Sequence, residues 1–133
     1  MMSQKLKTIF IISIPFFIAH GLEELFNGFY NIDWSVKVMF GFFDEMPVPQ
    51  ATFWVFQIMI WLALIVFAFL ISNEKWRLRL MFLPGVIFIV ELHHIWKALE
   101  SWNYYPGVIT AIPIAIIGFL FWKELLKNFR NNV

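Results

Sequence analysis

Two short segments of this sequence place histidine and glutamate within otherwise apolar surroundings. His20, Glu23 and Glu24 lie in the first segment, and Glu91 and His94 lie in the second. At about 100° of helix per residue, side chains three or four positions apart share one face, so each segment would present its polar groups together. Imidazoles and carboxylates are good ligands for divalent metals, and Glu-x-x-His pairs on facing helices hold the metals of ferritin-like proteins. The spacing therefore predicts an intramembrane metal site or acid–base site.

The candidate metal ligands are the side chains of these two segments: His20, Glu23, Glu24, Glu91 and His94. Such a set suits one divalent ion, or two ions bridged by carboxylates, and Zn, Fe and Mn are the candidate metals. The neighbouring His93 would point about 160° away from Glu91 on a helix, so we expect His94 to be the partner of Glu91.

The same residues could instead form an acid–base set that acts on a substrate. Carboxylates that crowd together in a low dielectric cannot all ionise, so one of them keeps a proton near neutral pH and can act as a general acid. A tyrosine placed over this layer could donate or orient a proton as well. The candidate catalytic residues are Glu23, Glu24, Glu91 and Tyr104.

A purely structural role is the alternative to both kinds of site. Ionised side chains inside a membrane cost at least about 2.5 kcal/mol each on the insertion scale, so these groups must pair, share protons or bind a cation. Hydrogen-bonded ion pairs would satisfy them while only fixing how the helices pack. Thr110 is likewise expected to make a helix–helix hydrogen bond.

The composition indicates that membrane helices must position these residues. Of the 133 residues, 61% are hydrophobic and 14% are charged, whereas about a quarter of the residues of a soluble domain are charged. Residues 46–73 and 101–122 contain no charged side chain and no histidine, and each range exceeds the roughly 20 residues that cross a bilayer as helix. The absence of cysteine excludes disulfides and thiolate metal sites, and the net charge of +1 argues against nucleic-acid binding.

We therefore expect an all-α fold, with one integral-membrane domain over residues 1–133 and four transmembrane helices in a bundle. The expected helices cover residues of about 7–29, 50–72, 78–99 and 106–127, and the interfacial loop between the first two contains Asp33, which is placed to cap a short helix. Basic residues divide eight against two between the two sides, so the positive-inside rule puts both termini in the cytoplasm, in a bacterial cytoplasmic membrane. His20 and Glu91 then share one layer, about 18 to 20 Å from the inner surface.

Three elements of the sequence, taken together, resemble the HXXEE-domain family of integral membrane proteins. They are His20-Gly-Leu-Glu23-Glu24, a second histidine that is His93 or His94, and Tyr104-Tyr105-Pro106-Gly107. The resemblance extends over residues 8 to about 125. It implies an integral membrane fold and singles out the same residues as the spacing does, and it implies no particular activity.

The function that we expect is that of a membrane enzyme, metal-dependent or acid–base, such as an isomerase, cyclase or hydrolase. Its substrate would be a lipid-like or isoprenoid-like molecule from the outer leaflet. The expected partners are membrane lipids, this apolar small molecule and further copies of the chain in a homo-oligomer, with no nucleic acid. One alternative is a proton- or cation-coupled carrier, although the inner halves of the helices lack matching ionisable residues. The other is a non-catalytic membrane partner whose cluster only fixes helix packing.

Overall fold

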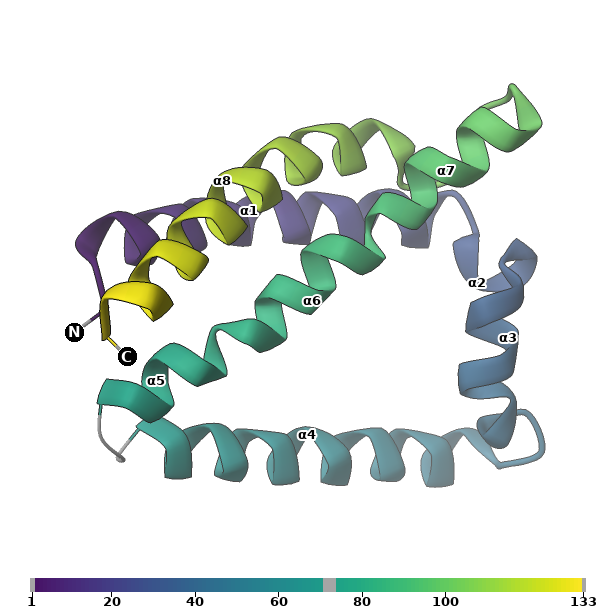
Figure 1. Ribbon diagram of the computed structural model, residues 1–133. Coiled ribbons are helices and arrows are strands. Elements are labelled where there is room, and N and C mark those ends of the chain that lie inside the picture. The colour runs from purple at the N-terminus through teal and green to yellow at the C-terminus, as the bar shows by residue number, and fades with distance from the viewer. Residues whose placement is uncertain (1, 71–73, 133) are drawn as a thin grey trace.

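A computed structural model describes residues 2–70 and 74–132 of the chain, and within these ranges it contains helices and no strands. The predicted all-α class is therefore confirmed. Figure 1 shows the elements in chain order: α1 (Gln4–Phe26), α2 (Phe29–Ile32), α3 (Trp34–Phe40), the 3₁₀ helix η1 (Gly41–Phe43), α4 (Val48–Leu70), α5 (Glu74–Leu80), α6 (Phe82–Val90), α7 (Leu92–Ser101) and α8 (Val108–Asn132).

Side-chain caps define where two of these helices begin. The Ser3 hydroxyl accepts the backbone N–H of Leu6 at 3.2 Å at the start of α1. The Asp33 carboxylate accepts the N–H groups of Ser35 at 2.8 Å and Val36 at 3.3 Å at the start of α3. Such caps satisfy N–H groups that have no partner within the helix. The cap predicted at Asp33 is confirmed.

The third membrane segment is divided into α5, α6 and α7, whereas the sequence predicts one helix over residues of about 78–99. The first division has a clear cause: Pro84 has no N–H to offer the carbonyl of Leu80, and α5 ends at Leu80. The second division falls at Glu91, where the N–H of His94 reaches back only three residues, to the Glu91 carbonyl at 3.3 Å. The carboxylate of Glu91 thus projects from a tightened turn.

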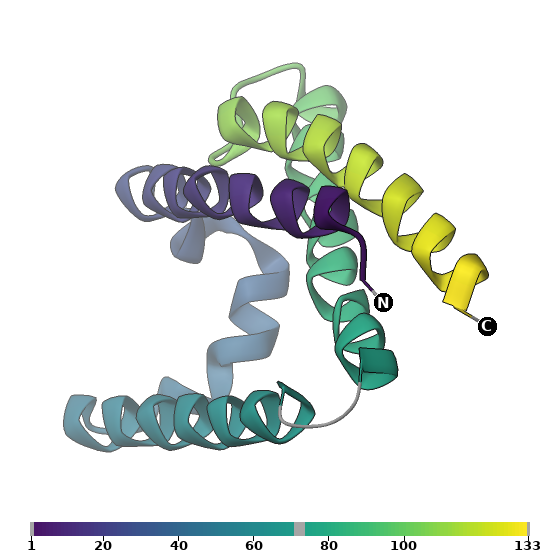
Figure 2. The ribbon, with the colours of Figure 1, turned by 90° about the vertical axis from the view of Figure 1, so that its left-hand side faces the viewer.

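Among the residues that the structure describes, three segments are long and apolar enough to cross a membrane: Gln4–Phe26, Glu74–Ser101 and Val108–Asn131. In the described part of the chain, α8 packs against α1, α5, α6 and α7, whereas the main contact of α4 is with α5. Figures 1 and 2 show α4 apart from α1 and α8. The structure therefore supports a membrane protein with these three spans, and it does not show the predicted four-helix bundle.

The core lies where α8 meets α1 and α6. Phe121 and Ile114 of α8 are fully buried there, together with Leu6, and Phe88 of α6 is 2% exposed. Gly118 lets α8 and α6 approach each other closely, because a Cβ atom at that position would lie 2.9 Å from the Cβ of Phe88. Many apolar side chains point outward instead, as expected for helices that face lipid.

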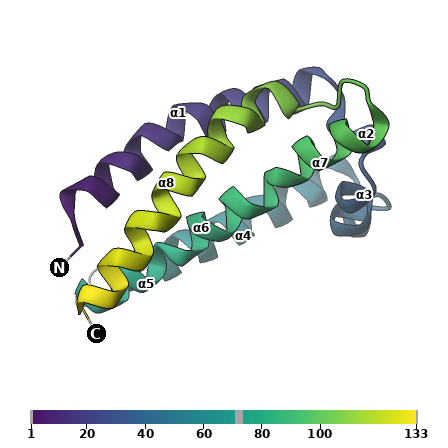
Figure 3. The same ribbon diagram turned by 45° about the horizontal axis from the view of Figure 1, so that its top comes forward.

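The two termini lie on one side of the molecule, and the loop between α7 and α8 lies on the opposite side (Figure 3). Figure 3 shows both termini beside α5 at one end, and α2, α3 and the loop between α7 and α8 at the other. The backbone N–H of Ser3 donates to the Asn128 side chain at 2.6 Å, which ties the start of α1 to the end of α8. The last turns of α1, the α6–α7 junction and the first turns of α8 therefore meet at the far end, where they position the site.

Candidate metal centre

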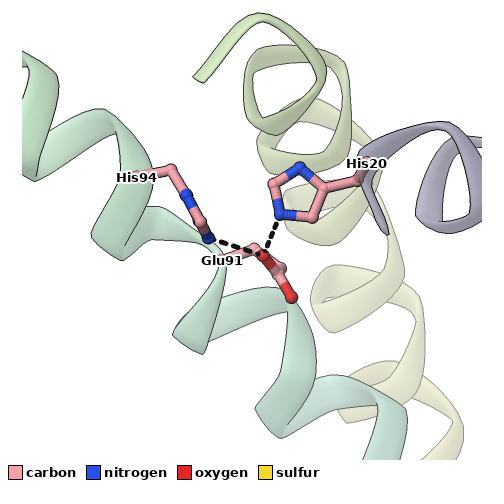
Figure 4. A group of neighbouring side chains, drawn as sticks. All are labelled: His20, Glu91 and His94. Carbon is pink, nitrogen blue, oxygen red and sulfur yellow. Dashed lines mark ion pairs between the residues drawn. The ribbon is translucent and has the colours of Figure 1, made fainter. Parts of the chain in front are cut away.

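Three of the predicted ligands converge in the structure. His20 comes from α1, Glu91 from the α6–α7 junction and His94 from α7, and each offers a ligand atom within 4.8 Å of the others. The Oε2 atom of Glu91 lies 2.6 Å from Nε2 of His20 and 3.4 Å from Nε2 of His94 (Figure 4). These three side chains, named here the His/Glu cluster, could hold a metal ion.

The two histidines of the cluster are buried, and one of their nitrogen atoms lacks a hydrogen bond. His20 is 3% exposed and His94 is 4% exposed. Although Nε2 of His20 lies 2.6 Å from Glu91, the contact does not have hydrogen-bond geometry, and no other described residue bonds to this nitrogen. A buried polar atom without a partner is costly, and a bound cation would provide the partner.

The hydrogen bonds on the far side of each imidazole assign the position of its proton. Nδ1 of His94 lies 2.7 Å from the backbone carbonyl of Pro106, which can only accept, so this nitrogen carries the hydrogen. Nδ1 of His20 lies 2.8 Å from the Thr110 hydroxyl. That hydroxyl donates to Oε2 of Glu23 at 2.5 Å, so it accepts from His20. In a neutral ring this arrangement leaves Nε2 unprotonated, and its lone pair can then bind a metal.

Glu24 lies beside the same two imidazoles. Its Oε1 atom is 3.1 Å from Nε2 of His94 and 3.7 Å from Nε2 of His20. It stands outside the group of three whose ligand atoms all lie near one another. Glu24, which is one of the predicted ligands, therefore adds a second carboxylate next to the His/Glu cluster and is not part of it.

Glu23 faces α8 instead of the cluster. Its carboxylate accepts the Tyr104 hydroxyl at 2.9 Å and the backbone N–H groups of Thr110 at 2.9 Å and Ile109 at 3.3 Å. Thr110 makes the expected helix–helix hydrogen bond, and its link to His20 connects Glu23 indirectly to the cluster. Glu23 is one of the predicted ligands, and the structure places it behind His20, to which Thr110 connects it.

The Tyr-Tyr-Pro-Gly loop supports both histidines, which the sequence alone does not reveal. Gly107 has φ +91°, a conformation that favours glycine. A Cβ atom on Gly107 would lie 2.7 Å from Cε1 of His20 and 2.7 Å from Nδ1 of His94. Burial and the hydrogen bond to Glu23 raise the pKa of Tyr104, so its phenol remains a donor. The loop therefore positions the two imidazoles through Pro106 and Gly107.

A second polar group lies next to the cluster and contains the other histidine. Nε2 of His93 lies 2.9 Å from Oδ2 of Asp33, and the Tyr105 hydroxyl donates to the same oxygen. Burial acts to raise the pKa of Asp33, but the hydrogen bonds from Ser35, Tyr105 and His93 outweigh it and hold that pKa well below its usual range. Burial and the bond to Asp33 raise the pKa of Tyr105. This group ties α3 to α7, and His93 lies outside the His/Glu cluster.

A cavity of about 650 Å³ opens beside the cluster. Glu24, Glu91 and His94 contribute to its wall, and His93 and Ser35 add further polar groups. The rest of the lining comes largely from apolar side chains: Leu25, Phe29, Tyr30, Val36, Met39, Phe40, Ile89 and Val90. The cavity thus joins a polar wall to an apolar interior formed by α1, α2, α3 and α6.

Comparisons of the chain with family models, with curated proteins and with solved structures found no match. The membership in the HXXEE-domain family therefore stays a prediction. The geometry of the His/Glu cluster and of the cavity beside it is what indicates a functional site.

Proposed function

We propose that this chain is an integral membrane protein that binds a divalent metal ion through His20, Glu91 and His94. The observation that carries the proposal is the orientation of the two imidazoles. Each Nδ1 atom is held by an acceptor, at Thr110 for His20 and at Pro106 for His94, so both Nε2 atoms face the carboxylates of Glu91 and Glu24. Packing alone would not require two matched tautomers, whereas metal ligation does.

Charge balance supports a divalent ion. Two neutral imidazoles and the carboxylates of Glu24 and Glu91 would together carry two negative charges in a low dielectric, where unpaired charges are costly. A divalent cation would bring the net charge of this set to zero. Glu24 is close enough to both imidazoles, at 3.1 and 3.7 Å, to share in that compensation.

The types of the ligand side chains limit which metals would bind and which reactions they would support. Two histidines and one carboxylate hold zinc in hydrolytic enzymes and Fe(II) in non-haem oxygenases. A metal in either class would supply Lewis acidity, or a nucleophilic hydroxide from bound water. In this chain Glu24 borders both the cluster and the cavity, which suits it to give or take a proton. Tyr104 would act through Glu23 as a positioning residue.

The cavity supports a lipid-like or isoprenoid-like substrate. Its volume of about 650 Å³ suits a small molecule, and its lining is largely apolar apart from the wall that carries Glu24, Glu91 and His94. A molecule with an apolar chain and one polar group would fit with that group against the cluster. We propose hydrolysis or acid–base isomerisation of such a group as the reaction class.

Two further features of the proposal concern the membrane. We propose α4 as a fourth span, because its 23 residues reach about 35 Å as helix and include no charged side chain. Both termini would lie in the cytoplasm, as the distribution of basic residues predicts. The location of both termini at one end of the molecule is compatible with four crossings.

Metal analysis of protein purified in detergent without added metal tests the proposal. We expect stoichiometric Zn, Fe or Mn, or stoichiometric binding when one of them is added, and loss of binding in His94→Gln. His93→Gln is the matched control, because it removes the adjacent imidazole and leaves the cluster intact. Protein with no metal and no binding on addition would contradict the proposal. Ion flux in proteoliposomes that disappears in Glu23→Gln would favour the carrier.

A further inference from the structure

A basic groove lies at the opposite end of the molecule, between the first turn of α1 and the last turns of α8. It is a cavity of about 710 Å³ lined by Lys5, Lys123, Glu124, Leu126, Lys127 and Arg130. Four cationic side chains thus surround one carboxylate. We name these residues the basic groove.

The one carboxylate of the basic groove is turned inward and already satisfied. Glu124 is 6% exposed, and its Oε1 atom accepts the Ser3 hydroxyl at 3.1 Å and the Asn128 amide at 3.3 Å. Its Oε2 atom lies 3.5 Å from Nζ of Lys5. Glu124 therefore pins α8 to the start of α1 and compensates at most one of the four cations.

The remaining cations share one face of α8 without a close acidic partner. Lys123, Lys127 and Arg130 are spaced four and three residues apart, so their side chains are neighbours on the helix surface, and all three are exposed. Within the described part of the chain, no carboxylate lies within ion-pair distance of any of them. Like charges at this spacing repel one another, and an anion bound between them would relieve that repulsion.

The position of the groove indicates where that anion would come from. Lys123 follows directly after Trp122, and the apolar stretch of the span ends there. The groove therefore opens at the membrane surface, and the exposed Leu126 gives it an apolar element facing outward. Basic pockets between spans at this level suit the phosphate of a lipid headgroup, whose chains can continue along the helix surface.

We infer that the basic groove binds the headgroup of an anionic phospholipid, with the phosphate between Lys123, Lys127 and Arg130. A tryptophan and lysines at the end of a helix also anchor it without any specific ligand, and the two cases differ in selectivity. Anchoring requires only positive charge at the surface. A headgroup site requires charge in this groove.

The test uses the full chain in a neutral detergent and measures bound lipid by native mass spectrometry. The probes are dioctanoyl phosphatidylglycerol, phosphatidylcholine with the same chains, and inorganic phosphate. We expect the anionic lipid to bind at least tenfold more tightly than the neutral lipid. The double variant Lys123→Gln/Lys127→Gln should weaken binding of the anionic lipid by roughly tenfold or more and leave binding of the neutral lipid unchanged. Arg130→Gln, a single exposed change, should weaken it in the same direction.

The matched control is Lys7→Gln/Lys75→Gln, which removes two positive charges outside the groove, one from the first turn of α1 and one from α5. It should retain the lipid preference. Equal loss in the control, or equal binding of both lipids by the unmodified chain, would overturn the inference. Displacement of the lipid by millimolar inorganic phosphate would show a site for free anions and would also overturn it. None of these outcomes bears on the metal proposal, because the His/Glu cluster lies at the other end.

Discussion

A side chain at position 107 would occupy the space that the His20 ring fills, since a Cβ atom there would lie 2.7 Å from Cε1 of His20. The same atom would lie 2.7 Å from Nδ1 of His94. One glycine therefore allows two imidazoles to approach the backbone of the α7–α8 loop. Their alignment toward Glu91 depends on this close approach.

Gly107→Ala should accordingly disrupt the centre. The methyl group would displace both rings, and the backbone would be strained at φ +91°, so we expect a loss of roughly 1 to 3 kcal/mol in the free energy of unfolding together with weaker metal binding. Thermal unfolding and metal titration would measure the two effects. Gly21→Ala is the control, because nothing lies within 4 Å of its Cβ position. Unchanged metal affinity in Gly107→Ala would show that the loop does not position the ligands.

Thr110 should matter through its hydroxyl. Thr110→Val removes the group that links Nδ1 of His20 to Glu23, so the His20 ring loses the contact that fixes its tautomer. We expect metal affinity to fall by about 10- to 100-fold, the range typical of groups that orient a ligand. Thr110→Ser keeps the hydroxyl and should retain most of the affinity in the same titration. Equal losses in both variants would contradict a specific role of the hydroxyl.

Glu91 and Glu24 should differ in their effect on metal binding. Both carboxylates lie near His94, but Glu91 is 2.6 Å from Nε2 of His20, whereas Glu24 is 3.7 Å from that atom and lies outside the His/Glu cluster. Glu24→Gln should therefore lower the metal affinity by roughly 10- to 100-fold, and Glu91→Gln should lower it further. Calorimetry with Zn and Mn would rank the two. The reverse order would make Glu24 the principal carboxylate ligand.

Asp33 should make stability depend on pH in the acid range. Its pKa is lower in the folded protein than the ordinary value of 3.8, so its contribution to stability is fully present above that value and is lost as the pH falls toward the folded pKa. Thermal unfolding between pH 7 and pH 3 should show a decline at the acid end. Asp33→Asn keeps a helix cap and removes the charge, so it should lower stability near neutral pH and flatten the acid decline. A variant that declines as steeply as the unmodified chain would contradict the assignment to Asp33.

Helical periodicity was enough to identify much of the cluster. The spacing of Glu91 and His94 puts them on one face, and matched depth brings His20 to the same layer; the structure has all three together. Glu23 shows the limit of this reasoning. It lies on the same helix as His20, but donors from Tyr104 and Thr110, more than 80 residues away in sequence, turn its carboxylate toward α8. Periodicity describes one helix and contains no information on the donors of another.

The larger arrangement was predictable only in class. Apolar composition indicates helices in a membrane, and Pro84 marks the break after Leu80. The turn at Glu91 contains no proline or glycine, so the residue types there do not predict it. The faces of α4, which packs against α5, carry no charged side chain. Such surfaces do not specify a partner by hydrophobicity alone, because lipid satisfies them as well as protein does.

The central position of α8 has a consequence for biosynthesis. His20 leaves the ribosome first, Glu91 and His94 follow about 70 residues later, and Pro106, Gly107 and Thr110, which hold the rings, come after them. Until α8 is inserted, the earlier helices carry histidines and glutamates whose supports have not yet been synthesised. Assembly of the centre must therefore wait until α8 has been synthesised, and a chain truncated before α8 should be recognised by membrane quality control as unfinished.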